Sequence, residues 1–213
     1  RAVVLNERRQ PGVYLCLEDT TALSWSGKQA IAGLGPIGNS AAGLQGFLVH
    51  TVLGGRWHDA PQPHSTRQPV EVLGVGDQPY SVRTPCRKPS ESSQERLQRA
   101  RESQVWPQAR QRLGRAPEGV RWIRVADREA DIYEDVVSGQ ELGQGFVIRA
   151  AKDRALSHPE TGKRVGRFFA AVRRAVPLGE CTLDLRQRPH PPARPAHWVV
   201  RATSVALSAP WRP

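Results

Sequence analysis

Two strand-like segments that each run into a carboxylate constrain this chain more than any other feature of its sequence. Residues 13–17 form a short apolar run with β-branched and aromatic side chains, and the run meets Glu18 and Asp19 at its end. Residues 120–126 have the same strand-like character and are followed by Asp127. The sequence therefore predicts that Asp19 and Asp127 stand at the ends of neighbouring strands.

These two aspartates have a functional and a purely structural interpretation. Two carboxylates at adjacent strand ends repel each other unless a divalent cation lies between them, and hard oxygen ligands suit Mg²⁺ or Mn²⁺. In the structural interpretation, Asp19 is a simple strand terminator and Asp127 is an ordinary helix N-cap, with Glu129 and Asp131 complementing the helix dipole. The residues alone leave both interpretations open.

The predicted order of elements indicates an α/β fold. Three strands come first, most simply as an antiparallel meander, and helices and strands then alternate. Residues 20–46 are rich in Gly, Ser and Ala and are predicted to be a long loop. The predicted elements are strands at 13–17, 47–53 and 70–75, a helix from Glu102 to Gly114, a strand at 120–126, a helix ending at Gly139, a strand at 145–150 and an amphipathic helix at 165–176.

A second, smaller segment is predicted after the last helix. The strand-like runs 181–185 and 197–202 flank a link rich in Pro and Arg, and they indicate the beginning of an all-β element. The predicted domains are therefore an α/β core at 1–178 and the start of a β-strand insertion at 179–213.

Two local patterns are easily mistaken for binding sites. Residues 33–38 match the G-x-G-x-x-G dinucleotide fingerprint, but the first glycine does not follow a strand directly and Pro36 interrupts the turn. His50 lies inside the apolar run 47–53, where a core histidine is the preferred interpretation over a ligand.

The charge of the chain points to a polyanionic partner. There are 31 Lys and Arg residues against 20 Asp and Glu, which gives a net charge of +11. The basic residues are spread over strands and helices and do not form one amphipathic membrane-binding helix, so nucleic acid is the favoured partner over a membrane. Arginine is favoured at bidentate phosphate contacts, although GC-rich genomes also produce arginine-rich chains without such a role.

The remaining composition favours a cytoplasmic protein without a membrane anchor. Three widely spaced cysteines with no C-x-x-C pair indicate neither a disulfide framework nor a zinc site. There is no apolar run of about 18 residues and no secretory leader. The absence of methionine, with Arg1 at the start and Pro213 at the end, leads us to expect a piece of a longer protein.

The two carboxylate strings, taken together, resemble the DDE transposases of bacterial insertion sequences, in the branch with the Tn-five-like cut-and-paste enzymes. The resemblance rests on residues 17–21 (Leu-Glu-Asp-Thr-Thr), 102–106 (Glu-Ser-Gln-Val-Trp), 127–132 (Asp-Arg-Glu-Ala-Asp-Ile) and 146–149 (Phe-Val-Ile-Arg). It extends over essentially all of the chain. The string at 127–132, in its strand context, is the most specific part.

The resemblance implies a ribonuclease-H-like mixed sheet flanked by helices, with an all-β insertion after its fifth strand. In such a core three carboxylates bind two Mg²⁺ ions, and the ions support DNA strand cleavage and strand transfer by in-line displacement at phosphorus. Asp19 and Asp127 are the implied first and second catalytic and metal-binding residues. Transposon ends and target DNA are the implied partners. The resemblance is also compatible with a homodimer of the intact protein. The basic residues expected to contact DNA near this edge are Arg128, Arg149, Lys152 and Arg154.

The sequence departs from the family pattern at its third carboxylate. The family places a glutamate in a Y-x-x-R-x-x-x-E string, whereas Tyr80 and Arg83 are followed by Arg87 at the glutamate position. Asp19 lies almost at the start of the sequence, so we expect the family's N-terminal DNA-end-binding region to be absent as well. We therefore expect a truncated core that catalyses no strand transfer by itself.

Two alternatives remain beside the transposase interpretation. One is a non-catalytic nucleic-acid-binding module that uses the same fold and basic surface without metal chemistry. The other is a stand-alone nuclease in which Glu18 or Asp131 replaces the third carboxylate.

Overall fold

The computed structural model describes residues 10–27, 31–38, 43–58, 70–83, 102–185 and 194–210. The chain forms two compact units, residues 1–151 and 152–213. The units divide earlier than the predicted domain boundary at 178, because residues 155–157 hydrogen-bond to residues 206–208 and so belong with the C-terminal segment. The domain assignment itself remains a prediction.

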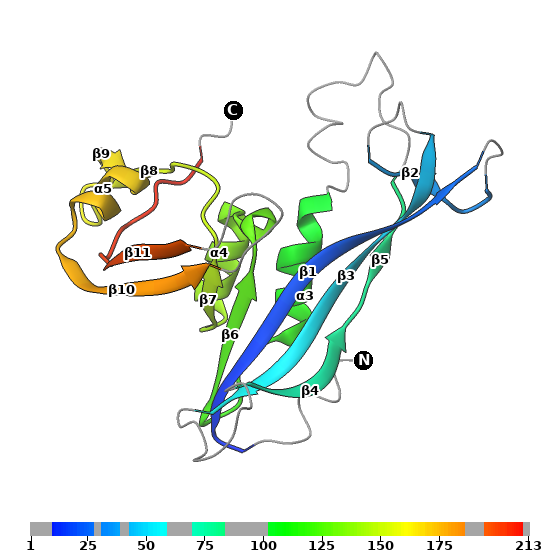
Figure 1. The fold of residues 1–213 in the computed structure, drawn as a ribbon, viewed down its shortest axis with the longest axis horizontal. Coiled ribbons are helices and arrows are strands. Elements are labelled where there is room, and N and C mark those ends of the chain that lie inside the picture. The colour runs from blue at the N-terminus through cyan, green and yellow to red at the C-terminus, as the bar shows by residue number, and fades with distance from the viewer. Residues whose placement is uncertain are drawn as a thin grey trace. The chain divides into compact units, whose positions relative to one another are not determined.

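The first unit contains a mixed sheet, so the α/β class predicted from the sequence is confirmed (Figure 1). β1 is antiparallel to β3 and parallel to β6, and β6 is parallel to β7. β4 and β5 both pair with β3 on its other side, which confirms the predicted meander. The strands are β1 (Gly12–Ser26), β2 (Gly35–Pro36), β3 (Leu44–Trp57), β4 (Val70–Asp77), β5 (Tyr80–Ser81), β6 (Val120–Ala126) and β7 (Gly145–Ile148).

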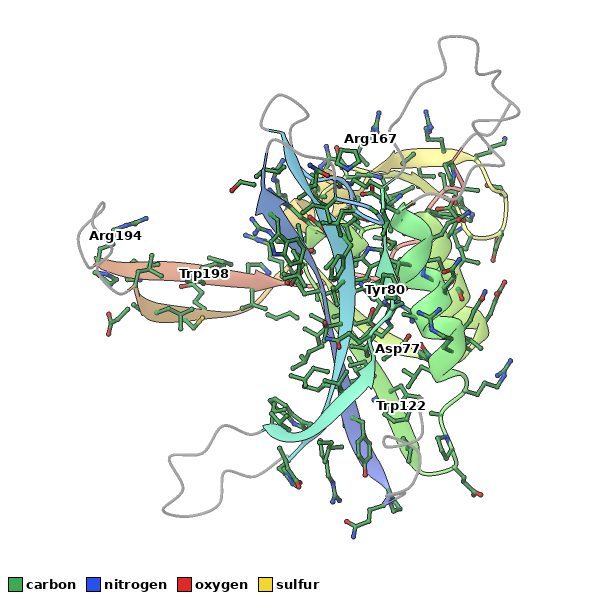
Figure 2. All side chains as sticks on the ribbon, turned by 90° about the vertical axis from the view of Figure 1, so that its right-hand side faces the viewer. Asp77, Tyr80, Trp122, Arg167, Arg194 and Trp198 are labelled. Carbon is green, nitrogen blue, oxygen red and sulfur yellow. The ribbon has the colours of Figure 1, made fainter. Side chains whose placement is uncertain are left out.

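Two α-helices contact each other on one side of this sheet (Figure 2). α3 (Val105–Leu113) follows the 3₁₀ turn η2 (Glu102–Gln104) and ends at Gly114, whose φ of 73° is a left-handed conformation suited to glycine. α4 (Tyr133–Glu141) follows the 3₁₀ turn η3 (Arg128–Ala130). No helix in the described ranges is long and apolar enough to span a membrane.

Side chains alternate along each strand between a buried face and a half-exposed face of the sheet. Tyr14 and Cys16 on β1 and Trp122 on β6 point toward the helices and form the core with Val52 and Ala109. Burial raises the pKa of the Cys16 thiol to about 12, so this cysteine stays protonated. The other face carries half-buried apolar side chains, namely Leu15, Leu17, Leu53, Ile123 and Val125.

The predicted loop at 20–46 is wrong in much of its extent. β1 continues through Ser26, and β3 already begins at Leu44, so the two strands pair as far as Ser26 and Leu44. Cross-strand pairing with β3 extends the sheet through residues whose composition alone indicated a loop. Gly35–Pro36, inside the apparent dinucleotide fingerprint, forms the short strand β2, which agrees with the rejection of that motif.

The predicted C-cap at Gly139 is also wrong, because α4 continues to Glu141. Gly139 is buried inside the helix. A Cβ atom at this position would lie 2.3 Å from Nη1 of Arg110, so the glycine makes room for the Arg110 guanidinium. The packing of α3 against α4 thus explains this glycine better than helix capping does.

The described residues of the second unit (152–185 and 194–210) form two antiparallel strand pairs and one short helix. β8 (Ala155–Ser157) pairs with β9 (Arg164–Arg167), and β10 (Pro177–Leu185) pairs with β11 (Arg194–Arg201), both antiparallel. The predicted helix at 165–176 is shortened to α5 (Phe168–Arg174), because residues 164–167 pair with β8. Gly166, at φ 150°, has a backbone conformation incompatible with a helix.

Candidate metal-binding and DNA-contacting site

Asp19 lies inside β1 and not at its end, which corrects the predicted strand terminator. The parallel pairing of β1 with β6 stops at Glu18 and Ala126, whereas the antiparallel pairing of β1 with β3 continues to Ser26. Asp19 is therefore the first β1 residue beyond its paired segment with β6. Its side chain is exposed.

Asp127 corresponds to Asp19 on the neighbouring strand, because it directly follows Ala126, the last residue of β6 and the partner of Glu18. Its backbone is still extended, with φ −79° and ψ −167°, and its side chain is exposed. The Asp127 carboxylate also accepts a hydrogen bond from the Glu129 backbone N–H at 2.8 Å, so the N-cap interpretation describes a real contact. A carboxylate has two oxygens, and the cap uses one of them.

Arg149 completes a row with the two aspartates. Ala126 pairs with Ile148 on β7, and the N–H of Arg149 donates to the Ala126 carbonyl at 3.3 Å. Asp19, Asp127 and Arg149 are thus the next positions on β1, β6 and β7, with strands spaced about 4.8 Å apart. We call these three residues the carboxylate row. They bring two anionic oxygen donors and one guanidinium to one edge of the sheet.

The other predicted DNA-contacting residues divide between the two units. Arg128 is exposed in η3, directly after Asp127, and belongs to the first unit. Lys152 is exposed and Arg154 is half-buried, and both belong to the second unit. There, the Arg154 carbonyl accepts from the Phe168 backbone N–H at 2.9 Å, which ties the segment before β8 to the start of α5.

A buried ion-pair network lies on the helix-facing side of β1 and β6. Arg124 donates through Nε to Glu18 Oε1 at 2.5 Å and through Nη2 to the second Glu18 oxygen. Its Nη1 donates to Asp135 Oδ1, also at 2.5 Å. Arg110 donates to both Asp135 oxygens, at 3.2 and 3.0 Å, and to Gln144. The network links α3, α4, β1 and β6.

The charges of this network balance. Glu18, Arg110, Arg124 and Asp135 supply two negative and two positive charges, and each residue is at most 6% exposed. Burial lowers the pKa of Arg124, and the charge and hydrogen bond of Asp135 oppose that shift. A buried charge is tolerated only where it is paired and hydrogen-bonded, and every member of this network meets that condition.

His50 lies beside the network and is a core histidine, as its position in an apolar run indicated. Its Nδ1 shares a hydrogen bond with Thr20 Oγ1 at 2.9 Å, and its Nε2 lies 3.4 Å from Glu18 Oε2. Burial lowers the pKa of His50 to about 4, so the ring is neutral at pH 7. Smaller effects on this pKa come from the charges of Asp77, Arg112, Asp19 and Asp135.

The two proposed substitutes for a third carboxylate do not reach the exposed edge. Glu18 alternates with Asp19 along β1, so it points to the opposite face, where Arg124 occupies both of its oxygens. Asp131 is 8% exposed, and its Oδ2 accepts from the Ala151 backbone N–H at 2.7 Å. The structure therefore offers no support for a nuclease completed by either residue.

The carboxylate row fits a single hard divalent cation in its donor chemistry. Asp19 and Asp127 provide exposed carboxylate oxygens from adjacent parallel strands, and such oxygens are the donors that Mg²⁺ and Mn²⁺ prefer. Within the part of the chain that the structure describes, no group of three or more His, Cys, Asp or Glu residues is placed to hold a metal ion. This edge thus supplies two carboxylate side chains as candidate ligands.

Sequence reasoning missed the buried network, although one signal for it was present. Trp122 and Arg124 are two residues apart on β6, so they share a face of the strand. Once Trp122 is assigned to the core, Arg124 must be buried too and requires acidic partners. The partners themselves come from α4 and β1, and only the tertiary structure identifies them.

Comparison of the chain with models of known protein families and with curated proteins yields no match. The assignment of a function therefore rests on the residues and their geometry.

Proposed function

We propose that the first unit is a ribonuclease-H-like core of a DDE-type insertion-sequence transposase, acting on DNA through metal-assisted phosphoryl transfer. The observation that carries this proposal is the carboxylate row, in which Asp19, Asp127 and Arg149 each directly follow the last paired residue of the β1–β6 and β6–β7 ladders. The strand order, with β1 between antiparallel β3 and parallel β6, supports the same fold. The proposed compartment is the cytoplasm, in line with free Cys16 and Cys181.

Each residue of the row has a distinct task in this proposal. Asp19 and Asp127 hold the cation, and Arg149 neutralises a DNA phosphate beside it. When bound, the cation supplies activation of the attacking oxygen and stabilisation of the leaving oxygen. The buried ion-pair network fixes β1 against β6 from the opposite face, so that the two ligand-bearing strands keep their register.

A non-catalytic nucleic-acid-binding module is the second candidate. It is favoured by the hydrogen bond from Glu129 to the Asp127 carboxylate and by the absence of a third carboxylate ligand near the row within the described ranges. Both candidates bind DNA, and only the first requires a metal ion. Metal binding therefore separates them.

We expect the chain to bind one Mn²⁺ ion and to lose at least about tenfold in affinity on Asp19→Asn or Asp127→Asn. Residues that merely orient metal ligands already change affinity by about 10–100-fold, and a ligand itself contributes no less. Titration followed by the electron paramagnetic resonance of free Mn²⁺ measures this affinity. Asp184→Asn, an exposed aspartate on β10, is the matched control and should bind like the parent chain. Equal binding by all variants would favour the non-catalytic module.

DNA binding should weaken steeply as salt rises. If Arg128 and Arg149 of the first unit each neutralise one phosphate, the logarithm of the duplex-binding constant should fall with the logarithm of salt concentration at a slope of about −1.8. Arg149→Gln should make that slope shallower by about 0.9. Fluorescence anisotropy at several salt concentrations measures both values. A slope near zero would exclude phosphate contacts as the source of binding.

A further inference from the structure

An exposed strip of aromatic and aliphatic side chains crosses β1, β3 and β5. Leu23 and Trp25 on β1 are 42% and 47% exposed, and Tyr80 on β5 is 72% exposed (Tyr80 is labelled in Figure 2). The ring of Phe47 on β3 lies between the two other rings, with centroids 5.8 Å from Trp25 and 6.0 Å from Tyr80. We call these four residues the aromatic strip.

The aromatic strip lies on the same face of the sheet as Asp19. Residues 19, 21, 23 and 25 alternate with the residues of β1 that face α3, and the β1–β3 register is continuous through them. Successive rows on this face run from Asp19 with Thr51, through Thr21 with Val49 and Tyr80, to Leu23 with Phe47. The strip thus begins one row beyond the carboxylate row.

A contiguous patch of exposed aromatic and aliphatic side chains, unlike a single exposed one, is typical of a binding surface. The strip presents two strongly exposed rings, whereas His50 and Trp106 contact each other on the opposite, buried face with centroids 4.5 Å apart. Unpaired nucleic-acid bases stack on such rings, because every base has a π-face, and the contact tolerates any sequence. In a DNA duplex these faces are covered by neighbouring base pairs.

We propose that the aromatic strip binds the unpaired bases of a single DNA strand whose phosphate lies at the carboxylate row. This inference rests on the proposed function, which places a phosphate at Asp19 and Asp127. From Asp19 to Trp25 the strand covers about 20 Å at about 3.3 Å per residue, which spans a few nucleotides. The net charge of +11 suits a polyanionic strand, and the aromatic strip adds a preference for unpaired over paired DNA.

The test compares single-stranded and duplex DNA in the presence of a chelator. Binding of an oligothymidine of about 12 nucleotides, labelled with a fluorophore, is measured by anisotropy for the parent chain and for the double variant Trp25→Ala/Tyr80→Ala. The double variant should bind this oligonucleotide at least about tenfold more weakly, because each stacked base contributes about 1–3 kcal/mol. Its affinity for a duplex of matched length should change less than about threefold.

Two control variants separate stacking from general damage to the protein. Trp25→Phe/Tyr80→Phe keeps both rings and should retain affinity within about threefold. Trp198→Ala removes an exposed tryptophan from β11 and should leave oligothymidine binding unchanged. Circular dichroism and urea unfolding of each variant establish that it is folded.

Several outcomes would overturn the inference. Equal losses for single-stranded and duplex DNA would mean that the strip contributes to DNA binding without recognising unpaired bases. Unchanged oligothymidine binding, together with a shift from dimer to monomer in analytical ultracentrifugation, would assign it to self-association. The result is separable from the proposed function, because stacking is measured without metal: Mn²⁺ binding that is unaffected by Asp19→Asn would remove the transposase proposal and leave a single-strand-binding surface.

Discussion

Replacing Arg124 with methionine is expected to lower the free energy of unfolding by about 3–5 kcal/mol. The substitution leaves Glu18 buried without its bidentate partner and removes one of the two guanidinium groups that bind Asp135. An uncompensated buried carboxylate costs far more than the hydrophobic contact of methionine restores. Urea unfolding followed by tryptophan fluorescence measures this change.

The matched control is a pair of the same chemistry at the surface. Arg83 binds both oxygens of Glu102 at 2.6 and 2.8 Å, but these side chains are 33% and 53% exposed. Arg83→Met is therefore expected to cost at most about 1 kcal/mol. A similar small cost for Arg124→Met would contradict the burial of the network.

A double-mutant cycle tests whether the cost arises from the unpaired carboxylate. In a Glu18→Gln background, Arg124→Met should cost less than in the parent chain, because no charge is then left unpaired at position 18. A coupling energy of at least about 1 kcal/mol is expected for groups in direct contact within one network. Additive costs would mean that the two side chains act independently.

Acidification is expected to remove about 3 kcal/mol of stability through His50 alone. Its pKa in the folded protein is lowered to about 4, whereas an unfolded histidine titrates near 6.5. Between these values the unfolded chain binds a proton that the folded chain does not, so stability falls as the pH drops through this window. The contribution is fully present above about pH 6.5 and lost below about pH 4.

The measurement is the slope of unfolding free energy against pH, and not the stability at one pH. His50→Gln keeps a polar group near Thr20 but cannot titrate, so the slope between pH 6.5 and 4.5 should become shallower by about 1 kcal/mol per pH unit. An unchanged slope in His50→Gln would show that another group titrates in this pH window.

Local patterns in the sequence were sufficient to predict the α/β class, the meander and the strands that carry Asp19 and Asp127. Apolar runs of strand length and a glycine at the end of α3 are local signals, and they identify elements without knowledge of their partners. The same signals failed for β1 beyond Thr20, where pairing with β3 overrides the local preference for a loop. They also failed for β9, where pairing with β8 overrides the local preference for a helix.

The register between strands, by contrast, was decided only by the tertiary structure. It determines that Asp19, Asp127 and Arg149 share a row, and that Glu18, one residue away from Asp19, is buried against Arg124. A side chain in a strand points to one face or the other according to parity, so a shift of one residue would exchange Glu18 and Asp19. The sequence identified the candidate residues, and the pairing of β1 with β6 decided which of them reach the exposed edge, because burial and register are properties of contacts between distant segments.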